Sequence, residues 1–210
     1  MSTVFCVYTT TSTIPSFNEV LTLSNKYLVE ILKKHRIYDD YLIDVCIIDE
    51  QTDEVVPLDK SSPAVWSIDN QYAWFTVNEQ PGGCDAYVNN FSDYSNFEQW
   101  YIDFIDDTQV KVCKSKLKEC FESGLYWEFR RSAGQPAIIN LSYGLIAAAF
   151  TELTNGLIYS DDGAWDYAIF PTSANHFLQN FFNLQYSNPE YANWAEKCID
   201  IIRNGGKKEE

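Results

Sequence analysis

The fold is decided by the stretch Pro136-Ala-Ile-Ile-Asn-Leu-Ser-Tyr-Gly-Leu-Ile-Ala-Ala-Ala-Phe-Thr-Glu-Leu-Thr154. A proline near the first position and Asn155-Gly156 just beyond the last residue are the start and stop signals of a helix. Apolar side chains occupy both faces of that helix, as expected for a helix that is buried on all sides. The stretch therefore predicts a central buried helix around which the rest of the chain packs.

The segments next to this helix have strand patterns. Leu125 to Arg131 precedes it and Leu157 to Tyr159 follows it. Near the N-terminus, residues 3–9 are β-branched and aromatic, and Ser16-Phe17-Asn18-Glu19 matches a capping box, which predicts a strand and then a helix toward Lys34. Further helices are expected at residues 96–104, 114–123, 173–182 and 189–203.

Between residues 41 and 87 the pattern changes to short strands separated by acidic, Ser-Pro and Asp-Asn turn signals. We expect strands at residues 41–48, 55–58, 64–68 and 72–77. Consecutive short strands with short links form an antiparallel meander. The fold class predicted is α+β, with an N-terminal strand and helix, a meander, the central helix and C-terminal helices. We expect residues 1–204 to form a single domain and residues 205–210 to form a frayed tail.

Charge is the strongest compositional feature of the chain. The 210 residues carry a formal net charge of −15, and residues 1–107 hold 18 acidic side chains against 5 lysines and arginines. Such a field repels nucleic acid and anionic membranes, and it accelerates association with a basic protein. No run of residues is long and apolar enough to be a membrane helix, and the N-terminus does not have the pattern of a secretory signal, so a cytoplasmic location is expected.

Cofactors, metal ions and catalysis have little support in the sequence. The six cysteines contain no Cys-x-x-Cys pair, and His35 and His176, the two histidines, are not at ligand spacing with a cysteine. Six reduced thiols are therefore expected. Gly-x-Ser-x-Gly, phosphate-loop and dinucleotide glycine motifs are missing as well. These observations predict a protein that is not an enzyme and has no cofactor and no metal site.

The acidic N-terminal half contains the residues that we expect to bind a protein partner. Between Arg36 and Lys111, Lys60 is the one basic residue. Aromatic side chains are interleaved with the acids, and a surface of this kind anchors a partner by its aromatics and steers it by its charges. Core packing is the alternative for each aromatic. The partner-binding residues predicted are Asp39, Asp40, Asp49, Glu50, Asp53, Glu54, Trp66 and Trp74.

A second cluster follows the central helix in Tyr159-Ser-Asp-Asp-Gly-Ala-Trp-Asp-Tyr167. Its spacing does not match a calcium loop, and its serine, aspartates and glycine suit a capped structural corner. An arginine pair precedes the helix and could meet this corner if both strands share a sheet. The corner is either structural or an alternative site for an anionic small molecule or for catalysis. Its residues are Arg130, Arg131, Ser160, Asp161, Asp162, Trp165 and Asp166.

Three stretches carry a resemblance to a known family. They are Arg130-Arg-Ser-Ala-Gly-Gln-Pro-Ala137, the segment from Leu153 to Asp166, and Phe170-Pro171. Over roughly residues 125–185 the chain resembles small bacterial immunity proteins, which are encoded beside polymorphic or contact-dependent toxins. The resemblance implies a cytoplasmic, non-enzymatic α+β protein that binds one toxin domain and blocks its active site. If the toxin is a nuclease, an acidic inhibitor can occupy the basic cleft that binds phosphates.

Overall fold

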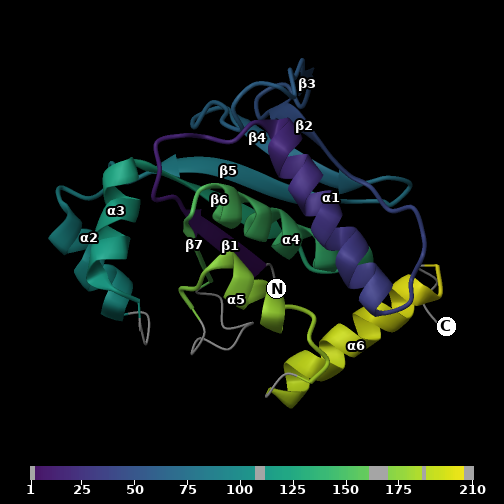
Figure 1. Cartoon of the computed structure of the whole chain (residues 1–210). Helices are drawn as coiled ribbons and strands as arrows, with labels where there is room; N and C mark the ends of the chain where they lie inside the picture. Colours follow the sequence, from purple (N-terminus) through teal and green to yellow (C-terminus); the bar gives the residue numbers. More distant parts are fainter. Residues whose placement is uncertain (1–2, 107–111, 161–169, 186–187, 206–210) are drawn as a thin grey trace.

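The computed structural model describes residues 3–106, 112–160, 170–185 and 188–205. Within these residues the chain forms one seven-stranded sheet and six helices (Figure 1). The strands are β1 (Thr3–Tyr8), β2 (Ile43–Asp49), β3 (Val55–Val56), β4 (Gln71–Val77), β5 (Cys84–Asn90), β6 (Leu125–Arg131) and β7 (Leu157–Tyr159). The helices are α1 (Phe17–Lys34), α2 (Phe97–Asp106), α3 (Lys114–Ser123), α4 (Ala137–Leu153), α5 (Ala174–Asn180) and α6 (Pro189–Arg203).

The sheet is antiparallel throughout, in the order β3-β2-β4-β5-β6-β1-β7. Strands β2, β4, β5 and β6 follow one another as a meander, and β1 inserts between β6 and β7. The α+β class and the antiparallel meander predicted from the sequence are therefore confirmed. Because β6 and β7 are both antiparallel to β1, they run parallel to each other, and their C-terminal ends lie at the same end of the sheet.

One of the predicted strands is wrong. Residues 64–68 form a loop, because the Ala64 N–H donates to the Pro15 carbonyl at 2.7 Å and the Val65 N–H donates to the Pro63 carbonyl, not to a neighbouring strand. Trp127 fixes the loop by donating its indole N–H to the Ala64 carbonyl at 3.0 Å. The strand that completes the meander is instead β5, which begins just beyond the turn at residues 80–83.

Helix α4 is the centre of the molecule, as the sequence predicts. Every residue from Ala137 to Thr151 is buried. The helix packs on the sheet through β1, β4, β6 and β7, and on its other sides through α1, α5 and α6. Phe150 illustrates the packing: its ring lies 4.9 Å from that of Trp127 and 5.1 Å from that of Phe129, both on β6. A helix in this position has no solvent face, which explains its apolar composition.

The two faces of the sheet differ. Helices α1, α4, α5 and α6 lie on one face, and α2 and α3 form a separate pair at one end (Figure 1). In that pair, α2 packs against Tyr8 of β1 through Trp100 and Phe104. Side chains alternate between the two faces along each strand. On the face opposite α4, none of the described helices covers the side chains of β4, β5 and β6 that lie beyond α2 and α3.

Candidate protein-docking surface

The uncovered part of the sheet carries a cluster of aromatic and charged side chains, which we call the outer-face cluster. It consists of Tyr72 and Trp74 on β4, Asp85 and Tyr87 on β5, and Arg130 on β6. Tyr72 stacks on Tyr87 with ring centroids 6.0 Å apart, and it meets Trp74 edge to face at 6.4 Å. The register places Trp74 opposite Asp85, and Asp85 opposite Arg130. Three strands therefore contribute to one continuous surface.

Arg130 organises the polar half of this cluster. Its Nη2 lies 2.6 Å from Asp85 Oδ2, and its Nε donates to the same oxygen at 2.8 Å. The same Nη2 also donates to the Tyr87 hydroxyl at 3.1 Å, and the guanidinium carbon lies 5.2 Å from the centre of the Tyr87 ring. Asp85 is buried, whereas Arg130 is exposed. An arginine that is paired with a carboxylate and lies beside aromatic rings is typical of residues that contribute most to protein binding.

The acidic hairpin between β2 and β3 borders this cluster. Burial raises the pKa of Tyr72, and the charges of Asp53, Asp85 and Glu50 raise it further. Burial and the Asp85 carboxylate raise the pKa of Tyr87 to about 12, against the opposing effect of Arg130, and Glu50 adds to the increase. The register gives the same placement, because Ile48 pairs with Tyr72 and Asp49 pairs with Gln71, so the hairpin that carries Glu50 and Asp53 begins directly beside Tyr72. The predicted acids at the hairpin and Trp74 thus share one surface.

The four acids of the hairpin are not equivalent. Asp49 accepts backbone hydrogen bonds from Gln51 at 2.9 Å and from Thr52 at 3.0 Å, so its carboxylate closes the turn. Glu50, Asp53 and Glu54 are exposed, and none of them forms an ion pair with a described residue. Asp49 therefore has a structural role beside its charge, and the other three carry uncompensated charge.

The other two predicted acids lie elsewhere. Asp39 and Asp40 precede β2, and the hairpin follows it, so the length of β2, about 20 Å, separates the two groups along the strand. The Asp40 carbonyl accepts a hydrogen bond from Asn78 Nδ2 at 2.9 Å, which places both acids beside the turn after β4. The set of acids predicted from the sequence is therefore two separate patches in the folded chain.

Trp66 corrects the predicted list of partner-binding residues. Its side chain is 7% exposed, and its ring centroid lies 6.0 Å from that of Phe17 at the start of α1. The indole belongs to the hydrophobic core and cannot contact a partner from this position. Trp74 is half-buried, with its ring on the outer face. Core packing, the alternative for every aromatic in this region, applies to Trp66 and not to Trp74.

The arginine pair does not act as a unit. Adjacent residues of a strand point to opposite faces, so Arg130 joins the outer-face cluster while Arg131 turns inward. Arg131 is buried, donates its Nε to Thr3 Oγ1 at 3.2 Å, and lies over the Tyr143 ring at 5.3 Å. The acid that pairs with Arg130 is Asp85 on the neighbouring strand. Whether either arginine also meets the acids of the corner after β7 stays a prediction, because those acids lie outside the described residues.

Of the residues that follow β7 in that corner, Ser160 is the one that the structure describes. Ser160 is fully buried, and its hydroxyl has no hydrogen-bond partner in the part of the chain that the structure describes. Asp161, Asp162, Trp165 and Asp166 lie outside the described residues. Strands β6 and β7 do share the sheet, with β1 between them. The choice between a structural corner and an alternative ligand site therefore stays a prediction.

No group of three His, Cys, Asp or Glu side chains among the described residues is arranged to hold a metal ion. No helix in the same residues is long and apolar enough to cross a membrane. The six cysteines form no disulfide and are free thiols, of which Cys113 is exposed. Comparison of the chain with protein-family models, curated proteins and solved structures found no match in any of the three.

Sequence reasoning missed three members of the outer-face cluster as site residues: Tyr72, Asp85 and Tyr87. Alternation within Gln71-Tyr-Ala-Trp-Phe-Thr-Val77 places Tyr72 and Trp74 on one face, and this signal is readable in the sequence. Asp85 has no comparable signal, because its role comes from Arg130, which lies 45 residues later in the chain. Only strand pairing brings these two side chains together.

Proposed function

We propose that this chain is an inhibitor-type binding protein that docks a basic protein partner on the outer-face cluster and the β2–β3 hairpin. The observation that carries the proposal is the continuity of these two features. Stacked aromatic rings and an arginine paired with Asp85 lie on strands whose register leads directly into the hairpin, and the hairpin carries three acids that form no ion pair with a described residue. Aromatic and arginine side chains anchor protein complexes, and charges at the rim steer the approach of the partner.

The resemblance to immunity proteins suggests the identity of the partner. We propose a toxin encoded by the neighbouring gene, held inactive in the cytoplasm while its active site is covered. A nuclease toxin suits the charge of this chain, because a cleft that binds phosphates is basic. The overall charge of −15 supports attraction to such a cleft, and the hairpin gives that attraction a defined location.

The first experiment asks whether the partner exists. The purified chain is mixed with the product of the neighbouring gene, and the complex is measured by calorimetry. We expect a one-to-one complex and survival of cells that express both proteins. If no complex forms and co-expression does not rescue the cells, the proposal is wrong.

The second experiment locates the surface. A hairpin triple variant carries Glu50→Gln, Asp53→Asn and Glu54→Gln. Asparagine is chosen because Asp53 has a φ of +56°, a conformation that asparagine tolerates. The matched control carries the same change in charge at Asp39→Asn, Asp40→Asn and Glu79→Gln. We expect the association rate to fall about tenfold for the hairpin triple and by much less for the control. Equal losses would place the steering in the overall charge and contradict the surface proposed.

A further inference from the structure

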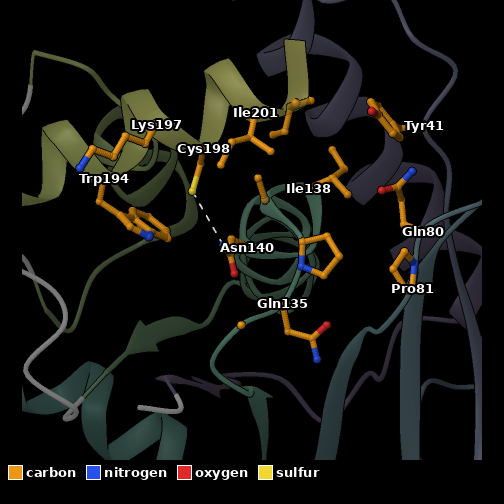
Figure 2. A pocket seen from close by; sticks show the side chains of 14 residues that line it. Tyr41, Gln80, Pro81, Gln135, Ile138, Asn140, Trp194, Lys197, Cys198 and Ile201 are labelled. Carbon is orange, nitrogen blue, oxygen red and sulfur yellow. Dashed lines mark hydrogen bonds between the residues drawn. The ribbon is translucent and has the colours of Figure 1, made fainter. Parts of the chain in front are cut away.

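A cavity of about 440 Å³ opens at the N-terminal end of α4 (Figure 2). Tyr41, the turn after β4, the first turn of α4 and one side of α6 form its walls. Most of the wall is apolar, with contributions from Pro81, Pro136, Ile138, Trp194 and Ile201. Cavities of this size and character bind small molecules. The cavity belongs to a different part of the molecule from the outer-face cluster.

A second hollow of about 460 Å³ adjoins the first, and the two share Tyr41 and Gln80. Its acidic side chains are Asp39, Asp40 and Glu79. All three are exposed, and none forms an ion pair with a described residue. Gly205, just beyond the C-terminal end of α6, also lines this hollow. Because a helix C-terminus carries partial negative charge, it adds to the field of the carboxylates.

The acidic hollow is held in place by hydrogen bonds. Asn78 accepts from the Leu42 N–H at 2.6 Å through its Oδ1 and donates to the Asp40 carbonyl at 2.9 Å through its Nδ2. Glu79 follows with a φ of +60°, which fixes the sharp turn after β4. The loop that carries Asp39 and Asp40 is therefore tied to the turn that carries Glu79, and the carboxylates do not depend on a frayed segment for their position.

A buried acceptor in the apolar cavity also lacks a donor. Asn140 lines the cavity and is 8% exposed, and its Oδ1 accepts no hydrogen bond within the described residues. Its Nδ2 faces Cys198 Sγ at 3.8 Å. An unsatisfied buried carbonyl oxygen destabilises the folded chain, and a bound N–H donor would satisfy it.

Charge is distributed unevenly around the cavity. Lys197 is the one charged side chain in the wall of the apolar cavity. Figure 2 shows it beside Trp194, on the opposite side of α4 from Tyr41 and Gln80. The acids of the second hollow lie at the Tyr41 and Gln80 end. A ligand with a positive group is therefore favoured at that end, with its apolar part in the cavity.

From this geometry we infer that the two hollows together bind a small amphipathic amine. The apolar body of the amine, aromatic or branched, occupies the cavity between Pro81, Ile138 and Ile201. The protonated amine lies among Asp39, Asp40 and Glu79, and an N–H of the body can donate to Asn140. The inference does not depend on the proposed partner, because it uses a different surface.

Tryptamine tests this inference, because it combines an indole body, an N–H donor and a protonated amine. Indole-3-acetate is the matched probe with the same body and the opposite charge. We expect calorimetry to show that tryptamine binds at least about tenfold more tightly than indole-3-acetate. We also expect the NMR signals of Tyr41 and Trp194 to shift when tryptamine is added. 1-Methyltryptamine, which lacks the N–H donor, is expected to bind more weakly than tryptamine.

Two triple variants separate the local effect from the overall charge. Asp39→Asn, Asp40→Asn and Glu79→Gln should abolish the preference for tryptamine over indole-3-acetate. The hairpin triple Glu50→Gln, Asp53→Asn and Glu54→Gln changes the net charge equally and should leave the preference intact. All six residues are exposed, so both variants are expected to fold. Equal binding of the two probes, no shift at Tyr41 and Trp194, or equal effects of the two variants would overturn the inference.

Discussion

The Arg130 guanidinium holds the buried Asp85 carboxylate across two neighbouring strands, with Nη2 and Oδ2 2.6 Å apart. The Asp85 side chain is 11% exposed, so the guanidinium takes the place of much of the water that an exposed carboxylate would contact. The pair lies in the middle of the outer-face cluster, and its removal should affect both the stability of the sheet and the shape of the surface.

Replacement Arg130→Met should lower the free energy of unfolding by about 2 kcal/mol, because it leaves a buried carboxylate without its cation. Urea denaturation measures the loss. The double variant Arg130→Met with Asp85→Asn should regain most of it. Lys114→Met is the control: it breaks an exposed ion pair with Glu98 and should cost less than about 1 kcal/mol. Equal losses for Arg130→Met and Lys114→Met would contradict a special role for the buried pair.

Tyr87 should make the protein sensitive to alkali. Burial and the Asp85 charge raise the pKa of Tyr87 to about 12 in the folded chain, whereas the pKa of a tyrosine in the unfolded chain is about 10. The unfolded chain loses the tyrosine proton at a lower pH than the folded chain does. The resulting stabilisation of the folded chain is therefore complete below about pH 10 and is lost as the pH rises from about 10 to about 12. Denaturation at several pH values should show this slope, and Tyr87→Phe should reduce it. A slope that Tyr87→Phe leaves unchanged would assign the effect to other groups.

Gly144 should tolerate no side chain. A Cβ at this position in α4 would lie 2.3 Å from Cζ of Phe181, which follows α5. We expect Gly144→Ala to cost about 2 kcal/mol of unfolding free energy through overpacking. Adding Phe181→Leu should restore part of the loss by making room, as thermal or chemical denaturation can show. If Gly144→Ala stabilises the protein, as helix propensity alone predicts, the close packing described here is wrong.

Trp74 should anchor the proposed partner. Its half-buried ring lies on the outer face beside Tyr72, where a partner can bury the rest of it. Trp74→Ala should weaken the complex about thirtyfold, corresponding to about 2 kcal/mol. Ile102→Ala is the control, because Ile102 is 54% exposed on α2, away from the cluster. Similar affinities for both variants would remove Trp74 from the binding surface.

The capping box before α1 is a prediction that the structure confirms in full. Ser16 Oγ accepts the Glu19 N–H at 3.2 Å, and the Glu19 carboxylate accepts the Ser16 N–H at 2.7 Å. Four residues are enough to specify this motif, so it can be read from the sequence. The strand expected at residues 64–68 shows the opposite case. Its composition suits a strand, but the tertiary contacts of Ala64 and Trp66 hold it as a loop.

Local signals were sufficient to predict the apolar helix α4, the capped helices and the alternating strands of the meander. Which side chains meet could be seen only in the folded chain. Arg130 and Arg131 are neighbours in sequence but lie on opposite faces of the sheet. The acids at the two ends of β2 form two separate patches. Asp85 and Arg130 are far apart in sequence but lie side by side, because β5 pairs with β6. Periodicity follows from the geometry of a single element, whereas proximity depends on strand order and register, which are set by the packing of the whole chain.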